Sequence, residues 1–318
     1  MVVAISTPGA SAARVRARGA RQICSTKIIF PAAADRTPTG HLALAWSLSM
    51  SRMRAADGGE MAVRPRQAVV ITGGTRGIGA GIAAAFLQAG GDVMVCGRTA
   101  PHDSAALPPS ADGRTPLFCQ ADVRDPDQAE RLIRTAHAEF GRVDVVISNA
   151  GGAPEAAAAT ASPRFHQKII ELNLVAPLHV AQSGNEVMQA QDGGGTIIMI
   201  GSVSGTRPSP GAAAYGAAKA GLHHLVTTLA IEWAPKVRLN CVAPGMVATE
   251  GAAGYYGDAD SAAAVAATVP LQRMATPADV ARACLFLASP AASYISGATL
   301  LVHGGGEPPA FLVARGPA

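Results

Sequence analysis

The chain has 318 residues, of which 49% are hydrophobic and 15% are charged, and its formal net charge is +4. Residues 1–60 hold eight basic and three acidic side chains, so the chain from residue 61 onward has 18 basic and 19 acidic ones. That part lacks the basic excess that nucleic acids or acidic membrane surfaces attract. We therefore expect neither nucleic acid nor membrane as a partner.

The first 60 residues show no sustained hydrophobic periodicity and are interrupted by proline, glycine, serine and arginine. An arginine-rich, acid-poor segment is typical of an organelle transit peptide. The alternative is that translation begins at Met53 or Met61. Both interpretations make residues 1–60 a disordered or non-native extension and place the catalytic domain at 61–318. We expect a cytoplasmic protein, or one in an organelle lumen if the extension is a transit peptide.

Downstream of Gln67, short apolar strands alternate with helical segments. Strands are predicted at Ala68–Thr72, Val93–Gly97, Leu117–Gln120, Val143–Ser148, Thr196–Gly201, Val237–Val242 and Thr299–Val302. Helices are predicted at Ala80–Ala89, Pro126–Phe140, Arg164–Ala190, Ala213–Ala234 and Pro277–Ala288. This alternation predicts βαβ units, and so a single Rossmann-type α/β domain: a doubly wound parallel sheet of about seven strands flanked by helices. The proline-rich stretch 99–116 is expected to be mostly loop.

A glycine-rich motif follows the first strand and opens the first helix. It reads Gly73-Gly74-Thr75-Arg76-Gly77-Ile78-Gly79. Glycines at this place allow a tight turn and a close approach of the backbone to a pyrophosphate, which then lies at the helix N-terminus. The strand–turn–helix context therefore predicts a dinucleotide-binding site.

The end of the second strand indicates which dinucleotide is bound. An NAD site has an acidic side chain there for the ribose 2′-hydroxyl, whereas this chain has Cys96-Gly97-Arg98-Thr99. Arg98 and Arg76 can instead converge on a 2′-phosphate, whose oxygens match guanidinium geometry. The alternative is that both arginines are solvated surface residues. We expect NADP(H), with NAD(H) less favoured.

Tyr215 and Lys219 are four residues apart in a predicted helix, so their side chains share one face. A free tyrosine titrates near pH ~10, and a nearby ammonium favours the phenolate. Lowering that pKa to ~7 would take about 4 kcal/mol. A surface Tyr/Lys pair is the alternative interpretation. The pair is a candidate for general acid/base catalysis near neutral pH.

Two further polar residues accompany this pair. Ser202 lies at the carboxyl end of the predicted strand Thr196–Gly201, where α/β sheets bind their ligands, and its hydroxyl can bond a substrate carbonyl oxygen. Asn173 is predicted in the middle of a helix, where asparagine has no propensity advantage, and it can hold a water beside Lys219.

Together these residues resemble the short-chain dehydrogenase/reductase superfamily, in its β-ketoacyl-reductase-like, NADP(H)-dependent branch. The resemblance runs from about Gln67 to Gly306. It rests on TGGTRGIG at 72–79, Ala121-Asp122-Val123, Asn149-Ala150-Gly151, Asn173, Ser202, YGAAK at 215–219 and Pro244-Gly245-Met246-Val247-Ala248-Thr249.

The resemblance implies a catalytic tetrad of Asn173, Ser202, Tyr215 and Lys219, and a set of cofactor contacts. The candidate cofactor contacts are Gly73, Thr75, Arg76, Gly77, Ile78, Gly79, Arg98, Asp122, Val123, Asn149, Ala150, Gly151, Tyr215, Lys219, Pro244, Gly245, Val247 and Thr249. Asp122 and Val123 would contact the adenine, and Val247 and Thr249 the nicotinamide carboxamide. Lys219 would also bind the nicotinamide ribose.

Two departures from the family pattern bear on these expectations. Asn173 is followed by leucine where glycine is often seen. The segment Ala176–Ala190 has no arginine, although relatives that use acyl carrier protein have basic residues in this region.

The five cysteines are scattered, without a CxxC pair or a Cys/His cluster, so no metal site is expected. His223 and His224 read as packing or surface residues. The Gly/Ala-rich segment Gly251–Thr268, with Tyr255 and Tyr256, is either a substrate lid or a plain loop. The tail after Gly304 ends the last strand, and Phe311-Leu312-Val313 can cover a neighbouring subunit's cleft.

The predicted activity is an NADP(H)-dependent transfer of hydride between the nicotinamide and a ketone or secondary alcohol, with Tyr215 as general acid/base. The expected partner is a small-molecule carbonyl or alcohol, and the expected state is a homo-oligomer, a dimer or tetramer. The alternatives are a 3-oxoacyl thioester reductase of fatty-acid or polyketide type, an epimerase or dehydratase on the same fold, and a non-catalytic NADP-binding scaffold.

Overall fold

The computed structural model describes residues 66–100, 113–252 and 256–315, and seven parallel strands form its sheet. They are β1 (Ala68–Thr72), β2 (Asp92–Gly97), β3 (Leu117–Gln120), β4 (Val145–Ser148), β5 (Gly195–Ile200), β6 (Val237–Pro244) and β7 (Thr299–Val302). The spatial order β3-β2-β1-β4-β5-β6-β7 reverses direction between β1 and β4, which makes this pair the topological switch point. The predicted doubly wound α/β sheet is confirmed.

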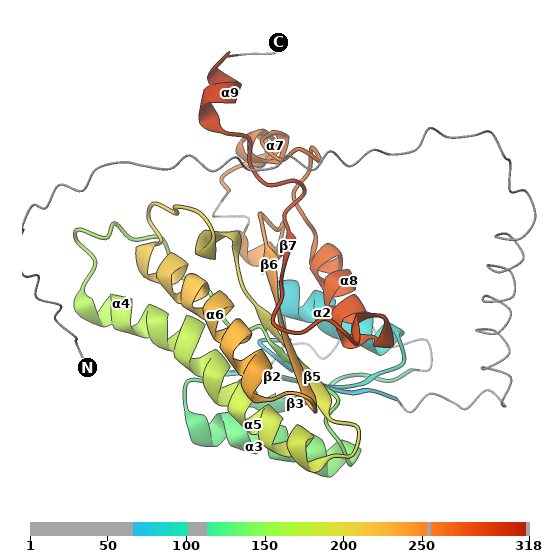
Figure 1. The fold of residues 1–318 in the computed structure, drawn as a ribbon. Helices are drawn as coiled ribbons and strands as arrows, with labels where there is room; N and C mark the ends of the chain where they lie inside the picture. The colour runs from blue at the N-terminus through green and yellow to red at the C-terminus, as the bar shows by residue number, and fades with distance from the viewer. Residues whose placement is uncertain (1–65, 101–112, 253–255, 316–318) are drawn as a thin grey trace, which may run out of the picture. The chain divides into compact units, whose positions relative to one another are not determined.

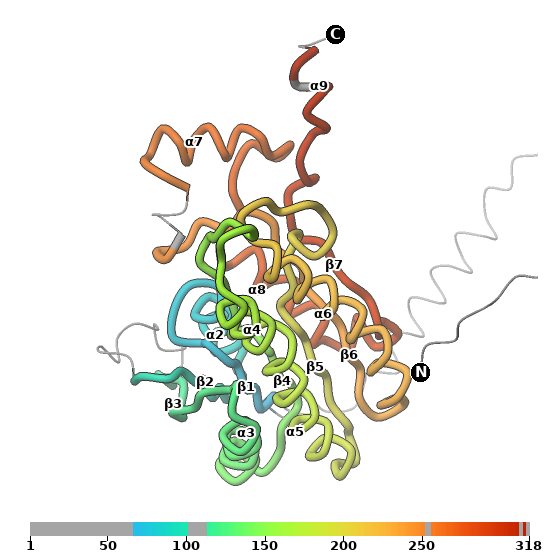
Figure 2. The backbone as a smooth tube through the Cα atoms, turned by 90° about the vertical axis from the view of Figure 1, so that its left-hand side faces the viewer, coloured from blue at the N-terminus to red at the C-terminus, as the bar shows by residue number. Residues whose placement is uncertain are grey.

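Helices cover both faces of the sheet (Figure 1). They are α2 (Gly77–Gln88), α3 (Pro126–Phe140), α4 (Pro163–Ile170), α5 (Ala176–Ala190), α6 (Ala213–Glu232), α7 (Ala259–Ala267), α8 (Pro277–Ala288) and α9 (Ala310–Arg315). α3, α5 and α6 pack on one face, and α2 and α8 on the other. Figure 2 looks onto the face that α5 and α6 cover. Because both faces are covered, every residue of β1 is buried, which explains its unbroken apolar run.

Local signals set the ends of the helices whose bounds were predicted correctly. The Asp125 carboxylate caps α3 by accepting a hydrogen bond from the backbone N–H of Asp127 at 3.0 Å, and Pro126 occupies the first helical position. Gly141 ends the helix with φ +75°, a left-handed conformation that suits glycine. At α8, Thr276 and Asp279 form a reciprocal capping box.

The predicted helix over 164–190 is interrupted. A five-residue π-helix, Glu171–Val175, separates α4 from α5. Pro177 supplies a physical reason, because it has no N–H to donate to the carbonyl of Asn173 four residues earlier, and its ring would clash there in a regular α-helix. Periodicity alone did not reveal this widened turn, which lies at a candidate catalytic residue, a common place for π-turns.

Two helices were not predicted from the sequence. α7 forms inside the glycine- and alanine-rich segment, capped by Asp258, whose carboxylate accepts from Ser261 N at 2.9 Å. Its alanine content favours helix, a signal that the neighbouring glycines obscured. α9 follows β7, and both helices lie beyond the same end of the sheet (Figure 1).

Several sequence-based expectations lie outside the described residues. These are the extension 1–60, Tyr255 of the lid segment, most of the second crossover, and the side chains of Leu312 and Val313. Among the described residues, no helix is both long and apolar enough to span a lipid bilayer.

Replacing Gly79 with alanine tests the packing of α2 against the loop before it. A Cβ at this position would overlap the carbonyl oxygen of Gly73 and lie 2.6 Å from Asn149 Nδ2. Although alanine is the better helix former by ~1 kcal/mol, we expect Gly79→Ala to lower the free energy of unfolding by about 1–3 kcal/mol through overpacking. Urea denaturation measures this. Gly251→Ala is the control, because nothing lies within 4 Å of a Cβ there. Equal stability of the two variants would contradict the packing.

Candidate active site

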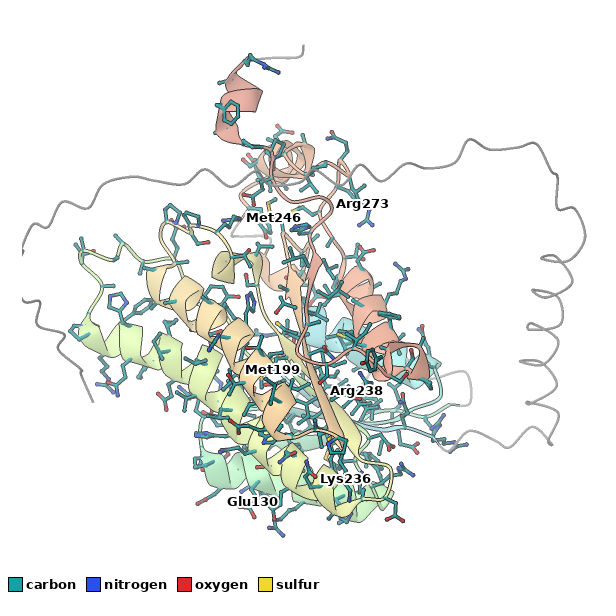
Figure 3. The ribbon with its side chains drawn as sticks, in the orientation of Figure 1. Glu130, Met199, Lys236, Arg238, Met246 and Arg273 are labelled. Atoms are coloured by element: carbon teal, nitrogen blue, oxygen red, sulfur yellow. The ribbon has the colours of Figure 1, made fainter. Side chains whose placement is uncertain are left out.

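The candidate residues gather at the edge where the strands end. Figure 3 shows the direction of β6: Arg238, near its start, lies towards the lower part of the sheet, and Met246, just past its end, lies at the top below α7. In doubly wound sheets ligands bind at this carboxyl edge. The glycine loop, Asn149 and Ser202 follow strands there, and Pro244 is the last residue of β6.

The glycine loop makes a tight turn into α2. Gly73 and Gly77 have φ of +63° and +55°, which side chains other than glycine rarely adopt. Arg76 occupies the N-cap position of α2, but its side chain makes no capping hydrogen bond. The first backbone N–H groups of α2 have no intrahelical acceptor, so they are available to an anion at the positive end of the helix dipole. This cradle fits a pyrophosphate.

Asn149 and Thr72 tie β1 to β4 at the switch point. The backbone N–H groups of Asn149 and Ala150 each donate to Thr72 Oγ1 at 2.9 Å. Asn149 Nδ2 donates to the carbonyls of Thr72 at 2.9 Å and Gly73 at 3.2 Å. The Asn149 amide therefore shapes the glycine loop directly. Sequence reasoning missed Thr72, although a hydroxyl at the end of a fully buried strand was a usable signal.

The predicted adenosine end combines β2 and β3. The backbone N–H of Ala121 donates to the carbonyl of Gly97 at 3.0 Å, which holds the turn after β3 beside the end of β2. Asp122 pairs with Arg124, and this pairing lowers the pKa of the Asp122 carboxyl against a smaller desolvation effect. Arg98 also contributes to lowering that pKa by its charge.

Arg76 and Arg98 are both exposed. In the described ranges neither guanidinium makes a hydrogen bond or an ion pair. Thr75, in the glycine loop, lies close to Gly97: a Cβ at position 97 would be 3.6 Å from Thr75 Oγ1. The loop that carries Arg76 therefore approaches the strand end that carries Arg98.

Lys219 is the one lysine among the buried residues that the structure describes, with 3% of its surface exposed. Its ammonium donates to the carbonyl of Ile200, at the end of β5, at 2.8 Å, and lies 5.6 Å from the centre of the Tyr215 ring. Desolvation lowers the pKa of Lys219 to about 8. Lys219 therefore remains mostly protonated at neutral pH and presents a desolvated positive charge to Tyr215.

Asn173 is fully buried within the π-helix. Its Oδ1 accepts from Gly152 N at 2.9 Å, and its Nδ2 donates to the carbonyls of Gly152 and Ile169 at 2.9 and 3.0 Å. A Cβ at Gly151 would lie 2.8 Å from Asn173 Oδ1 and 3.4 Å from Lys219 Nζ, so both residues border this loop. The asparagine amide holds the backbone after β4, a task that sequence reasoning did not assign to it.

Ser202 begins the turn that follows β5. Its Oγ accepts a hydrogen bond from Ser204 N at 3.1 Å and so caps the short helix Val203–Gly205. This turn packs on α6 near Tyr215: a Cβ at Gly216 would lie 2.9 Å from the Ser204 carbonyl oxygen. Because a hydroxyl that accepts a hydrogen bond can also donate one, Ser202 still has its own proton to donate.

The segment after β6 completes the site. Val247 is buried and pairs with Ala275, and Ala248 N donates to the Ala275 carbonyl at 2.8 Å. A Cβ at Gly77 would lie 3.7 Å from Thr249, so this segment meets the glycine loop. The structure thus brings together candidate residues that the sequence spreads from 73 to 249. Within the described ranges, no group of three or more potential metal ligands is found.

Known proteins resemble the chain over most of its length. A family model described as enoyl-(acyl carrier protein) reductase matches residues 73–307. The chain is 35% identical over 243 residues to a 3-oxoacyl-[acyl-carrier-protein] reductase of Chlamydia muridarum, which covers 75% of this chain and 96% of the relative. It is 36% identical over 240 residues to a cis-4-hydroxycyclohexanecarboxylate dehydrogenase of Sinomonas cyclohexanicum, covering 74% and 94%.

A solved structure is also similar to the chain. The ligand-free aldohexose dehydrogenase of Thermoplasma acidophilum superimposes with a TM-score of 0.69 at 27% identity, covering 80% of this chain and 96% of that one. The names of these relatives specify different substrates, so the similarity defines a family and not a substrate. The chain belongs to the short-chain dehydrogenase/reductase superfamily, whose members are oxidoreductases that use a nicotinamide cofactor.

Proposed function

We propose that this protein is an NADP(H)-dependent oxidoreductase that interconverts a ketone and a secondary alcohol, with Tyr215 as the general acid and base. One observation carries the proposal: the buried Lys219 ammonium lies 5.6 Å from the Tyr215 ring centre and bonds the end of β5, two residues before Ser202. A scaffold that only binds a dinucleotide can use a buried lysine on the ribose, but it has no need to place a tyrosine beside that lysine.

Tyr215 supplies the proton that the carbonyl oxygen requires during reduction. Loss of that proton leaves a phenolate, which the positive charge of Lys219 stabilises. The interaction gains strength because the ammonium is desolvated, so water screens it poorly. In the direction of alcohol oxidation, the same phenolate accepts the proton of the substrate hydroxyl.

Ser202 orients the substrate oxygen. Its Oγ already accepts from Ser204 N, so its own proton is free to point towards the carbonyl oxygen, where negative charge develops in the transition state. Asn173 acts indirectly, because its side chain holds the backbone of Gly152 against the π-helix. The backbone bordering Lys219 is thereby kept in one position.

The proposed cofactor site follows the carboxyl edge of the sheet. The glycine loop would hold the pyrophosphate, Arg76 and Arg98 the 2′-phosphate, and Lys219 the nicotinamide ribose. Val247 and Thr249 would hold the carboxamide. When bound, the reduced nicotinamide supplies the hydride that the carbonyl carbon accepts.

Reduction of a 3-oxoacyl thioester is the second candidate activity. The 35% identity to the chlamydial 3-oxoacyl-[acyl-carrier-protein] reductase favours it. The absence of arginine from Ala176–Ala190 argues against an acyl-carrier-protein substrate, because an acidic carrier needs a basic surface. An NADPH-consumption assay with simple ketones and acetoacetyl thioesters side by side distinguishes the two activities.

Tyr215→Phe is the principal test of the mechanism. It keeps the ring and removes the hydroxyl, so turnover should fall at least about 100-fold, at the lower end of what positioned acid/base catalysis contributes. NADPH affinity should change little. Lys219→Met, which removes the charge and keeps the length, should reduce turnover and weaken NADPH binding together. Steady-state kinetics and fluorescence titration measure the two effects. Near wild-type turnover in Tyr215→Phe would refute the assignment.

The preference for NADPH should depend on the end of β2. At Gly97 a Cβ would meet its nearest neighbour, the Thr99 carbonyl oxygen, at an ordinary 3.5 Å, so a side chain fits. Gly97→Asp puts a carboxylate where the 2′-phosphate is expected, and it should lower NADPH affinity by roughly 10- to 150-fold and reverse the preference towards NADH. Gly97→Ala, the uncharged control, should keep the preference. If the wild-type protein bound both dinucleotides equally, Arg76 and Arg98 would have no such role.

The α7 segment should close over the bound substrate. None of its residues is buried, and Gly257, just before its N-cap, has φ +80°, so few contacts hold the helix in place. We expect amide exchange in α7 to slow when NADPH and a substrate analogue bind, as hydrogen–deuterium exchange reports. Exchange in α3, which lies below the sheet, provides the internal reference. Unchanged rates in α7 would show that it is no lid.

A further inference from the structure

The imidazole of His223 fills the inside of the turn that carries Ser202. The turn begins at Gly201, and a Cβ there would overlap His223 Nε2. It ends at Gly205, where a Cβ would lie 2.8 Å from His223 Cε1. The backbone on both sides of Ser202 therefore lies against one ring. The ring, together with Cys241 Sγ at Gly201 and the backbone of Lys219 and Ala220 at Gly205, leaves little room for a side chain at these two positions.

A hydrogen bond joins the ring to the serine itself. The backbone N–H of Ser202 donates to His223 Nε2 at 3.4 Å. A neutral imidazole has one donor and one acceptor nitrogen, so acceptance at Nε2 requires the proton on Nδ1. His224, the next residue, is exposed and has no part in this turn.

We propose that His223 is a positioning residue for Ser202: as a neutral hydrogen-bond acceptor, it fixes the backbone from which the serine hydroxyl reaches the substrate oxygen. The inference rests on the proposed function, in which Ser202 bonds that oxygen. Tyr215, Lys219 and His223 follow one another at four-residue spacing on α6. One face of α6 thus carries the proposed proton donor Tyr215, the cation Lys219 beside it, and His223, which supports Ser202.

Burial, together with a nearby charge, keeps His223 neutral, which is the form that this role needs. The titratable groups that face it are Lys219 on its own helix and, across Gly201, the thiol of Cys241 on β6. Burial, and then the positive charge of Lys219, lower the pKa of His223. Burial raises the pKa of Cys241 to about 11, so the thiol is neutral. At neutral pH the imidazole is therefore uncharged, and acidification through its depressed pKa would put a proton on Nε2 and break the bond.

Two substitutions distinguish the role of His223 as a hydrogen-bond acceptor from its role in filling space. In His223→Gln, the side-chain oxygen can take the place of Nε2 as acceptor, whereas His223→Leu fills space without an acceptor. We expect His223→Leu to lower kcat about tenfold or more, as small displacements of a reacting group do, with NADPH affinity unchanged, and His223→Gln to restore most of kcat. His224→Gln and His224→Leu are matched controls. Wild-type kcat in His223→Leu, or no rescue by glutamine, overturns the proposal.

The pH dependence of kcat provides a second test, because it would not change if His223 acted only by filling space. Wild-type kcat should fall on the acid side as His223 becomes protonated, while His223→Gln, which cannot titrate, should keep its activity there. This comparison tests the positioning role of neutral His223 even if His223→Leu does not fold. An acid limb that persists unchanged in His223→Gln overturns the proposal.

The tautomer can be observed without any substrate. In protein labelled with ¹⁵N-histidine, long-range ¹H–¹⁵N correlations should show His223 neutral at pH 7 with its proton on Nδ1. A proton on Nε2 overturns the inference whatever the activity. If His223 shows the expected tautomer but no ketone is turned over, the proposed function fails and the structural role of His223 stands.

Discussion

The buried ammonium of Lys219 is the interaction on which the rest of the site depends. Burying a charge is costly unless it is compensated, and in the described part of the chain its hydrogen bond goes to the Ile200 carbonyl. An ammonium has three donors, so two remain for other acceptors. Its charge acts on Tyr215, His223 and Cys241 together, favouring the phenolate, the neutral imidazole and the ionised thiol. At the thiol burial outweighs this charge, and at the imidazole burial acts in the same direction.

The position of that ammonium is set by contacts from both halves of the sheet. The Thr72–Asn149 hydrogen bonds fix the loops after β1 and β4 against each other at the switch point. The loop after β4 then meets Asn173 and Lys219 at Gly151. A series of hydrogen bonds and contacts therefore runs from the glycine loop to the loop beside Lys219.

We expect members of this family to differ in the segments that lie beyond the carboxyl edge of the sheet. There an ion pair between Arg207 and Glu307 at 2.5 Å joins the segment after β7 to the turn after Ser202. Both side chains are more than a third exposed, so the pair contributes little to stability and more to orienting the two segments. α7 and α9 lie beyond the same edge. The relatives differ in the substrates that they are named for, and these segments are where such differences can arise.

The sequence by itself determined the fold class and the bounds of elements such as α3 and β1. These features depend on local signals, namely apolar runs, helix caps and glycine turns, which act within a few residues. The π-helix at Asn173, the helix α7 and the contact of His223 with the Ser202 turn were decided only by tertiary structure. A hydrogen bond between residues 202 and 223 depends on how a turn packs on a helix, and neither periodicity nor spacing carries that information.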